Sequence, residues 1–122
     1  MNKPGIVDHG RIGQKQLAKE VAKSGIYAYP SFFEEISCIS AMRAQVAGAI
    51  PVTTDYAALA ETNKYGIKVP GKAGENNDVY LKELISLLKD EKRQEEIRKE
   101  MIKNKDIFSW ERVARQWQKE LF

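Results

Sequence analysis

The chain has 122 residues, which suffices for one modest domain and is too short for two. Hydrophobic residues make up 43% of it and charged residues 30%, a balance typical of soluble globular proteins rather than disordered ones. The only histidine, His9, and the only cysteine, Cys38, exclude an internal disulfide and a zinc site built from Cys and His ligands. The net charge of +3 is mild, and opposite charges alternate through the last third, which predicts a solvated surface and no nucleic-acid partner.

The sequence also indicates where the protein resides. No apolar run follows Lys3, so the N-terminal segment does not resemble a secretory signal. No apolar run approaches the roughly 18 residues that a membrane span requires. With a single cysteine, these features predict a cytoplasmic protein.

Strands and helices are predicted to alternate through the first two thirds of the chain. Four short segments rich in β-branched and aromatic residues are predicted strands: residues 6–8, 26–29, 50–54 and 65–70. Between them, apolar spacing predicts helices at residues 14–24 and 37–47, each ended by a glycine, Gly25 or Gly48. Asp55 is predicted to cap a short helix that runs through Glu61.

Three further helices are predicted to begin at Asp78, Glu91 and Ser109, the last residue acting as a cap. Each should turn an apolar stripe inward: Leu81, Leu84, Ile85 and Leu88 on the first, Ile97 and Ile102 on the second, and Val113, Trp117 and Leu121 on the third. Trp110 and Trp117 are interpreted as packing residues, and Cys38 as a small buried residue rather than a nucleophile.

This alternation predicts an α/β fold: a Rossmann-like parallel sheet of about four strands with flanking helices. Ligands of such sheets bind at the carboxyl ends of the strands. The loops at residues 8–13, 30–38 and 53–56 should therefore meet at one functional edge.

The most specific pattern lies at residues 29–54. It consists of Tyr29-Pro30-Ser31 at a strand end, an acidic residue at Glu35, a helix of small residues, and Gly48-Ala49-Ile50-Pro51-Val52. This order resembles glycosyltransferase family four, whose members have the GT-B fold. Gly10-Arg11-Ile12, residues 58–62 with Gly66-Ile67, and the aromatic-Ser-Trp run at residues 108–110 fit the same family in order. Residues 1–122 therefore resemble part of the C-terminal, nucleotide-sugar-binding domain of such an enzyme.

The resemblance implies hexose transfer from a nucleoside-diphosphate sugar, with retention of configuration, no bound metal and no cofactor besides the donor substrate. It implies Glu35 as the catalytic-site residue, contacting hydroxyls of the donor sugar. The donor-binding residues it implies are Gly10, Arg11, Ile12, Ser31, Glu35, Ile36, Ser37, Cys38, Ile39 and Arg43. A helix that starts near Ser37 would offer backbone N–H groups and a partial positive charge to the leaving diphosphate.

Arg43 departs from the family pattern. The family places a ribose-binding glutamate eight positions after the first, and an arginine there can donate but cannot accept hydrogen bonds. His9 is interpreted as an ordinary loop histidine, with a place beside the nucleobase as the sharper alternative. The alternative for Glu34 and Glu35 is that they are ordinary acidic residues of a loop. A glycosidase pair is disfavoured, because adjacent residues cannot flank a bond from two sides.

The resemblance also implies that the front of the domain, with its basic phosphate clamp, and the acceptor domain are missing. The isolated chain should then be inactive as a transferase, with a nucleotide sugar and an acceptor domain or another chain as partners. An uncovered sheet edge would favour self-association. The alternative function is a non-catalytic binding or assembly module derived from this fold, favoured by Arg43 and the missing clamp. A flavodoxin-like receiver is disfavoured, because Asp8 is the only acid at an early strand end.

Overall fold

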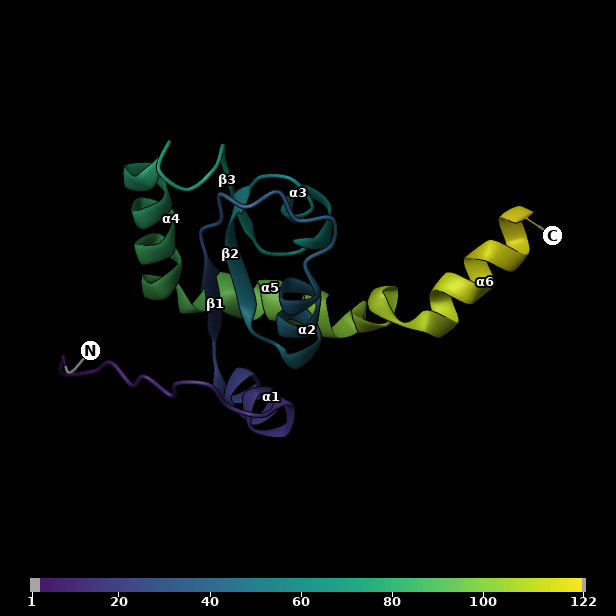
Figure 1. Cartoon of the computed structure of the whole chain (residues 1–122), viewed down its shortest axis with the longest axis horizontal. Coiled ribbons are helices and arrows are strands. Elements are labelled where there is room, and N and C mark those ends of the chain that lie inside the picture. Colours follow the sequence, from purple (N-terminus) through teal and green to yellow (C-terminus); the bar gives the residue numbers. More distant parts are fainter. Residues whose placement is uncertain (1–2, 122) are drawn as a thin grey trace.

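The computed structural model describes residues 3–121 and contains one parallel sheet (Figure 1). The strands β1 (Ile26–Tyr29), β2 (Ile50–Asp55) and β3 (Ile67–Pro70) lie side by side in that order. Helices α2 (Ile39–Ala47) and α3 (Leu59–Thr62) connect successive strands and pack on β2. Helices α4 (Asn77–Lys89) and α5 (Glu91–Lys103) cover the opposite face. The predicted α/β fold with a parallel sheet and flanking helices is therefore confirmed.

Two helices lie at the margins of this body. Helix α1 (Gln14–Lys23) precedes β1 and packs on α2. After α5, the short 3-10 helix η1 (Lys105–Phe108) contacts α2, and α6 (Trp110–Leu121) then projects away from the body (Figure 1). Within residues 3–121, no helix has the length and apolar character needed to cross a membrane.

The sheet has three strands, one fewer than predicted, within the part of the chain that the structure describes. Residues 6–8, predicted as a strand, are irregular, and Ile6 and Val7 are 47% and 75% exposed. A three-residue strand needs a neighbour to pair its N–H and C=O groups, and no strand of residues 3–121 pairs with it. The prediction that Asp55 caps a helix is also wrong, because Asp55 ends β2 and α3 begins at Leu59. The other elements agree with prediction except at their ends.

Two glycines allow the chain to turn between a helix and the strand that follows it: Gly48 between α2 and β2, and Gly66 between α3 and β3. Gly48 ends α2 in a left-handed conformation, with φ of 92°, which a side chain would disfavour. Gly66 precedes β3, and a Cβ there would collide with the carbonyl oxygen of Pro51. Pro51 is tolerated in the central strand because pairing with β3 begins one residue later, at Val52.

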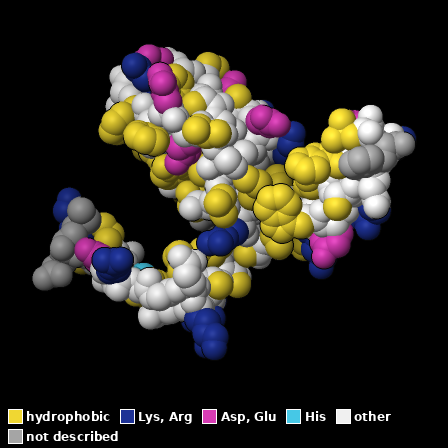
Figure 2. Space-filling model, turned by 45° about the vertical axis from the view of Figure 1, so that its right-hand side comes forward, with side chains coloured by type: hydrophobic (Ala, Val, Ile, Leu, Met, Phe, Trp, Pro, Cys, Tyr) yellow, Lys and Arg dark blue, Asp and Glu magenta, His cyan; other side chains and the backbone are white. Residues whose placement is uncertain are grey.

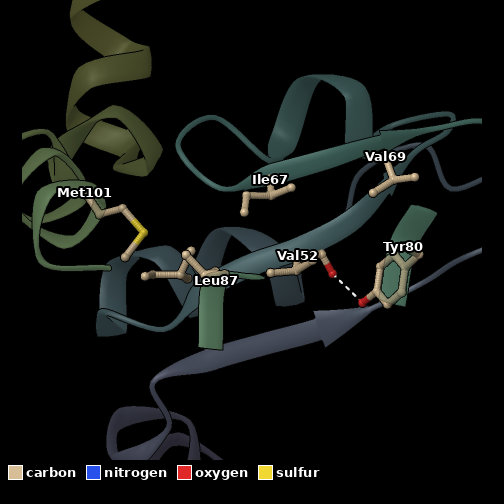
Figure 3. Close-up of a cluster of buried hydrophobic side chains, with 7 residues drawn as sticks. Val52, Ile67, Val69, Tyr80, Leu87 and Met101 are labelled. Atoms are coloured by element: carbon tan, nitrogen blue, oxygen red, sulfur yellow. Dashed lines mark hydrogen bonds between the residues drawn. The ribbon is translucent and has the colours of Figure 1, made fainter. Parts of the chain in front are cut away.

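Alternate strand residues form the larger core on the face covered by α4 and α5 (Figure 3). Its buried members are Ile50, Val52, Ile67, Val69, Tyr80, Leu87 and Met101. Tyr80 enters this apolar cluster with its hydroxyl donating to the carbonyl oxygen of Val52 at 2.7 Å. The cluster is therefore hydrophobic but contains one satisfied polar group.

The inward faces of the last three helices differ from prediction. Helix α4 buries Tyr80 and Leu87, and Leu84 packs on the core as predicted. The other predicted inward residues, Leu81, Ile85 and Leu88, are 47–57% exposed. The two stripes are offset by one residue, which is about 100° around a helix. On α5, Met101 is buried, Ile97 packs on the core as predicted, and Ile102 is exposed. No residue of α6 is fully buried, so the predicted packing of Trp110, Trp117 and Leu121 is wrong, whereas Val113 is half-buried.

Candidate functional site

The carboxyl ends of the strands are joined by hydrogen bonds between the loops that follow them. After β1, the backbone N–H of Ser31 donates to Thr54 Oγ1 at 3.0 Å, and this hydroxyl donates to the carbonyl of Ser31 at 2.8 Å. The same carbonyl accepts from Ala73 N, beyond β3, at 3.0 Å. The carbonyl of Glu35 accepts from Ala58 N, after β2, at 3.1 Å. Two of the three predicted loops therefore meet at this edge.

The third predicted loop does not reach the edge. Gly10, Arg11 and Ile12 belong to the irregular segment before α1, which lies beyond the amino end of β1 (Figure 1). The local contact there is a short turn, in which Gly10 N donates to Asp8 Oδ1 at 2.9 Å. His9 lies in the same segment, with its Nε2 3.8 Å from Glu20 Oε2 on α1. The structure therefore places these residues apart from Glu35.

Glu35 lies in the loop between β1 and α2, and its carboxylate turns toward the sheet. Tyr29 donates its hydroxyl to Glu35 Oε1 at 3.0 Å, and this hydrogen bond is the main cause of a raised pKa of Tyr29. The other oxygen, Oε2, is buried and has no donor among the described residues. An unpaired buried acceptor costs about 1–3 kcal/mol. Glu35 is therefore held in place while retaining one unsatisfied oxygen.

Cys38 follows Glu35 and is buried, with 3% of its surface exposed, as predicted. Burial is the main cause that raises the pKa of its thiol, and the Glu35 carboxylate adds to it. The backbone N–H groups of Ala41 and Ser40 oppose this shift. The thiol therefore stays protonated near neutral pH and is a poor nucleophile.

The residues around the start of α2 are exposed at the same edge. Ile36 is fully exposed, Ile39 is 56% exposed, and Ser37 between them is exposed. No side chain caps the first turn of α2 by a hydrogen bond. The N–H groups in the first turn of a helix lack intrahelical partners and favour anions.

Arg43 lies on the outer side of α2, where its Nη1 donates to Gln14 Oε1 of α1 at 3.1 Å. It lines a groove of about 910 Å³ between α1, α2 and the η1–α6 segment. Ser37 and Ile39 line one part of this groove, whereas most of the remaining lining is apolar. Figure 2 shows hydrophobic side chains gathered where α6 leaves the body.

Sequence reasoning missed the tyrosines that organise this edge. Tyr29 was assigned only to a strand, yet its hydroxyl holds Glu35. Tyr56 donates its hydroxyl to Glu34 Oε1 at 3.1 Å, which raises the pKa of Tyr56. The alternation of β1 offers one signal, because Tyr27 and Tyr29 point to one face and their rings stack at 5.6 Å.

Known proteins do not identify this arrangement further. Comparisons with protein-family models, curated proteins and solved structures find no match to the chain. Within residues 3–121, no group of three His, Cys, Asp or Glu side chains is placed to hold a metal ion. What the described site offers is a carboxylate with a free oxygen, an uncapped helix start and one arginine.

Proposed function

We propose that this chain is the donor-binding portion of a retaining glycosyltransferase that transfers a hexose from a nucleoside-diphosphate sugar. The observation that carries the proposal is the position of Glu35, at the carboxyl edge and just before the uncapped start of α2. Parallel α/β sheets bind their ligands at this edge. The ordered motifs around Glu35, which resemble glycosyltransferase family four, support the same function.

In this proposal the two halves of the donor meet different groups. A sugar hydroxyl donates to Glu35 Oε2, which otherwise lacks a donor. Because Oε2 is buried, the loop after β1 shifts to admit the sugar, and the hydrogen bond from Tyr29 to Oε1 lengthens. The diphosphate lies at the first turn of α2, where backbone N–H groups stabilise the negative charge of the leaving group.

Arg43 takes a supporting part at the groove. Its guanidinium lies on the outer face of α2 and is already oriented by Gln14. An arginine donates to phosphate or ribose oxygens, so it contacts the nucleotide without replacing a ribose-binding carboxylate. The resemblance assigns the basic phosphate clamp to the front of the donor domain and the acceptor site to an acceptor domain. The isolated chain therefore binds the donor weakly and does not transfer sugar.

The second candidate function is a non-catalytic binding or assembly module derived from this fold. One observation favours it: the two polar side chains expected to contact the donor already have partners within the chain. Glu35 is bonded to Tyr29, and Arg43 is bonded to Gln14. The outer edge of β1 would serve such assembly, because no backbone hydrogen bond outside the β1–β2 ladder engages β1 within residues 3–121. A strand of another copy could pair there.

The experiment is a nuclear magnetic resonance titration of the purified chain with UDP, GDP and ADP and their sugar conjugates. We expect saturable shifts in residues 31–43 with one of these ligands, at concentrations on the order of 1 mM. Glu35→Gln should weaken binding of the sugar conjugate about tenfold, because a hydrogen bond to a charged group contributes roughly 1.5–3 kcal/mol. The Glu35→Gln substitution should weaken binding of the free nucleotide less.

Glu34→Gln is the matched control. Glu34 is the neighbouring acid, lies exposed and pairs with Tyr56, so its loss should leave sugar-nucleotide affinity within about twofold. Equal losses in the two variants would assign the effect to net charge and contradict the role of Glu35. The absence of any shift in a folded chain at millimolar ligand would favour the assembly module.

A further inference from the structure

Helix α6 has an apolar face that is largely uncovered within residues 3–121. Trp110, Val113, Trp117 and Leu121 recur at helical spacing, and the two tryptophans and Leu121 are 82%, 59% and 68% exposed. Ser109 caps the helix, since its Oγ accepts from Arg112 N at 3.2 Å. A helix of 12 residues is marginally stable in water without packing on its apolar face. The capped, amphipathic sequence is therefore suited to a helix that packs on a partner.

The opposite side of α6 is basic. At about 100° per residue, Arg112, Arg115 and Lys119 fall on the side facing away from the tryptophans. The apolar stripe is narrow and the charges lie across the helix from it. Lys and Arg across the helix from Trp and Leu occur both in helices that lie on a lipid surface and in helices seated in a protein groove, so the choice rests on the groove described next.

The same chain contains such a groove. Its floor is the outer face of α2, and its walls are α1 and the η1–α6 segment. Apolar side chains dominate the lining: Leu17, Val21, Met42, Val46, Phe108 and Trp110. Leu17 and Val46 are 42% and 47% exposed there, and the groove holds about 910 Å³. Three helices around an open apolar trough leave room for a fourth.

We propose that α6 of a second copy of this chain occupies the groove, and that the two copies exchange α6 reciprocally. A chain's own α6 cannot fill its groove, because Trp110 and Val113 form the rim and the helix leads outward from there (Figures 1 and 2). Since each copy carries one projecting helix and one groove, a two-fold axis satisfies both at once and closes the assembly. Because Arg43 lines this groove, a partner's α6 and a nucleotide held by Arg43 would compete for it.

Area and charge are consistent with such a dimer. A fully buried aromatic side chain covers about 150–250 Å². The total area buried in the dimer comes to about 1,000 Å², which counts the exposed parts of the two tryptophans, the surfaces that they cover, and the second, symmetric contact. That is the size at which specific interfaces begin. Arg43 is the one charged residue that lines the groove within residues 3–121, and the basic side of α6 faces outward, so the basic side chains of the incoming helix turn away from Arg43.

The test combines sedimentation equilibrium with tryptophan fluorescence, because the only two tryptophans of the chain both lie on α6. We expect a monomer–dimer equilibrium at micromolar concentrations, with tryptophan emission shifting to shorter wavelength as the dimer forms. Trp117→Ala with Leu121→Ala should weaken the dimer at least tenfold. Val46→Glu, at an exposed position of the groove, should do the same without disturbing α6. Arg115→Ala with Lys119→Ala, on the opposite side of α6, should leave it within about twofold.

Mixing the two disruptive variants tests the reciprocal geometry. The helix variant keeps an intact groove and the Val46→Glu variant keeps an intact α6, so the mixture should regain one of the two contacts and form heterodimers. A chain that stays monomeric at all concentrations would overturn the proposal. So would a dimer that survives both variants but dissociates on Ala28→Lys, which would place the contact at the β1 edge. Emission that shifts only with anionic phospholipid vesicles, in a monomeric chain, would assign α6 to a lipid surface instead.

Discussion

The two faces of the sheet are built differently. Under α4 and α5, large apolar side chains from β2, β3 and the helices form a continuous cluster. Under α2 and α3, the apolar cluster comprises Cys38, Ala41 and Leu59, with the two tyrosines of β1 packed against it. Small side chains bring α2 close to the sheet, and the remaining space is filled by polar groups rather than by larger apolar ones.

Buried amides connect the elements on the α2–α3 side. Gln45 donates to the carbonyls of Ala41 and Thr62, and its Oε1 accepts from the backbone N–H groups of Lys64 and Tyr65. Asn63 similarly donates to Thr53 Oγ1 and Ile67 O, and accepts from Gly66 N. Apolar packing is not directional, whereas hydrogen bonds fix positions. One face therefore contributes most of the stability, and the other sets the positions of α2 and the loops around the candidate site.

The largest expected effect comes from breaking the apolar face. Leu87 is fully buried in the cluster, and Leu87→Ala should lower the free energy of unfolding by about 2–5 kcal/mol. Small domains have only about 5–15 kcal/mol in total, so the variant should be marginally folded. Urea denaturation followed by circular dichroism measures the difference. The adjacent Leu88 is 57% exposed on the same helix, and Leu88→Ala should cost less than about 1 kcal/mol. Equal losses would mean that α4 does not bury the stripe described.

A smaller loss is expected from the polar face. Gln45→Leu keeps most of the side-chain volume but leaves two carbonyls and two N–H groups without their partner. We expect a loss of about 2–3 kcal/mol, because some of these groups are partly exposed and can bond to water. Gln16→Leu makes the same change at an exposed position of α1 and should be nearly neutral. If Gln45→Leu were neutral too, hydrogen bonds would not position this face.

The fold was largely predictable from periodicity, but the inward face of α4 was not. Apolar residues recur on α4 at Tyr80, Leu84 and Leu87 and again one position later, so spacing alone supports two stripes. The sheet selects the first, because Tyr80 reaches the carbonyl of Val52. The segment at residues 6–8 was predicted as a strand and is irregular, since a strand needs a neighbouring strand that its own sequence cannot supply. Local propensity therefore predicts elements better than it predicts what they pack on.

The candidate site was predictable only where the pattern was continuous along the chain. Ser31, Glu35 and the start of α2 follow one strand, and the structure places them together at its carboxyl end. The bond between Arg43 and Gln14 joins two helices, and the bond between Tyr29 and Glu35 depends on how the loop folds back. Spacing along the chain carries no information on such contacts. The packing of α6 was mispredicted for a related reason, because an amphipathic pattern does not say which surface covers it.

The smallest effect is expected from removing the one polar group of the apolar cluster, which tests whether that face of the sheet is dry. Tyr80→Phe deletes the hydrogen bond to Val52 O and should cost about 1 kcal/mol at neutral pH, whereas Tyr56→Phe, at the surface, should cost less. The pH dependence separates burial from hydrogen bonding. Burial raises the pKa of Tyr80 to about 12, so between pH 10 and 12 the unfolded chain loses this proton first and the wild-type protein loses stability. The Tyr80→Phe variant should lose less stability over that range, which the midpoints of urea denaturation at pH 9, 10 and 11 can measure. Parallel decline in the two proteins would mean that Tyr80 ionises freely in the fold, and that the apolar face admits water at this position.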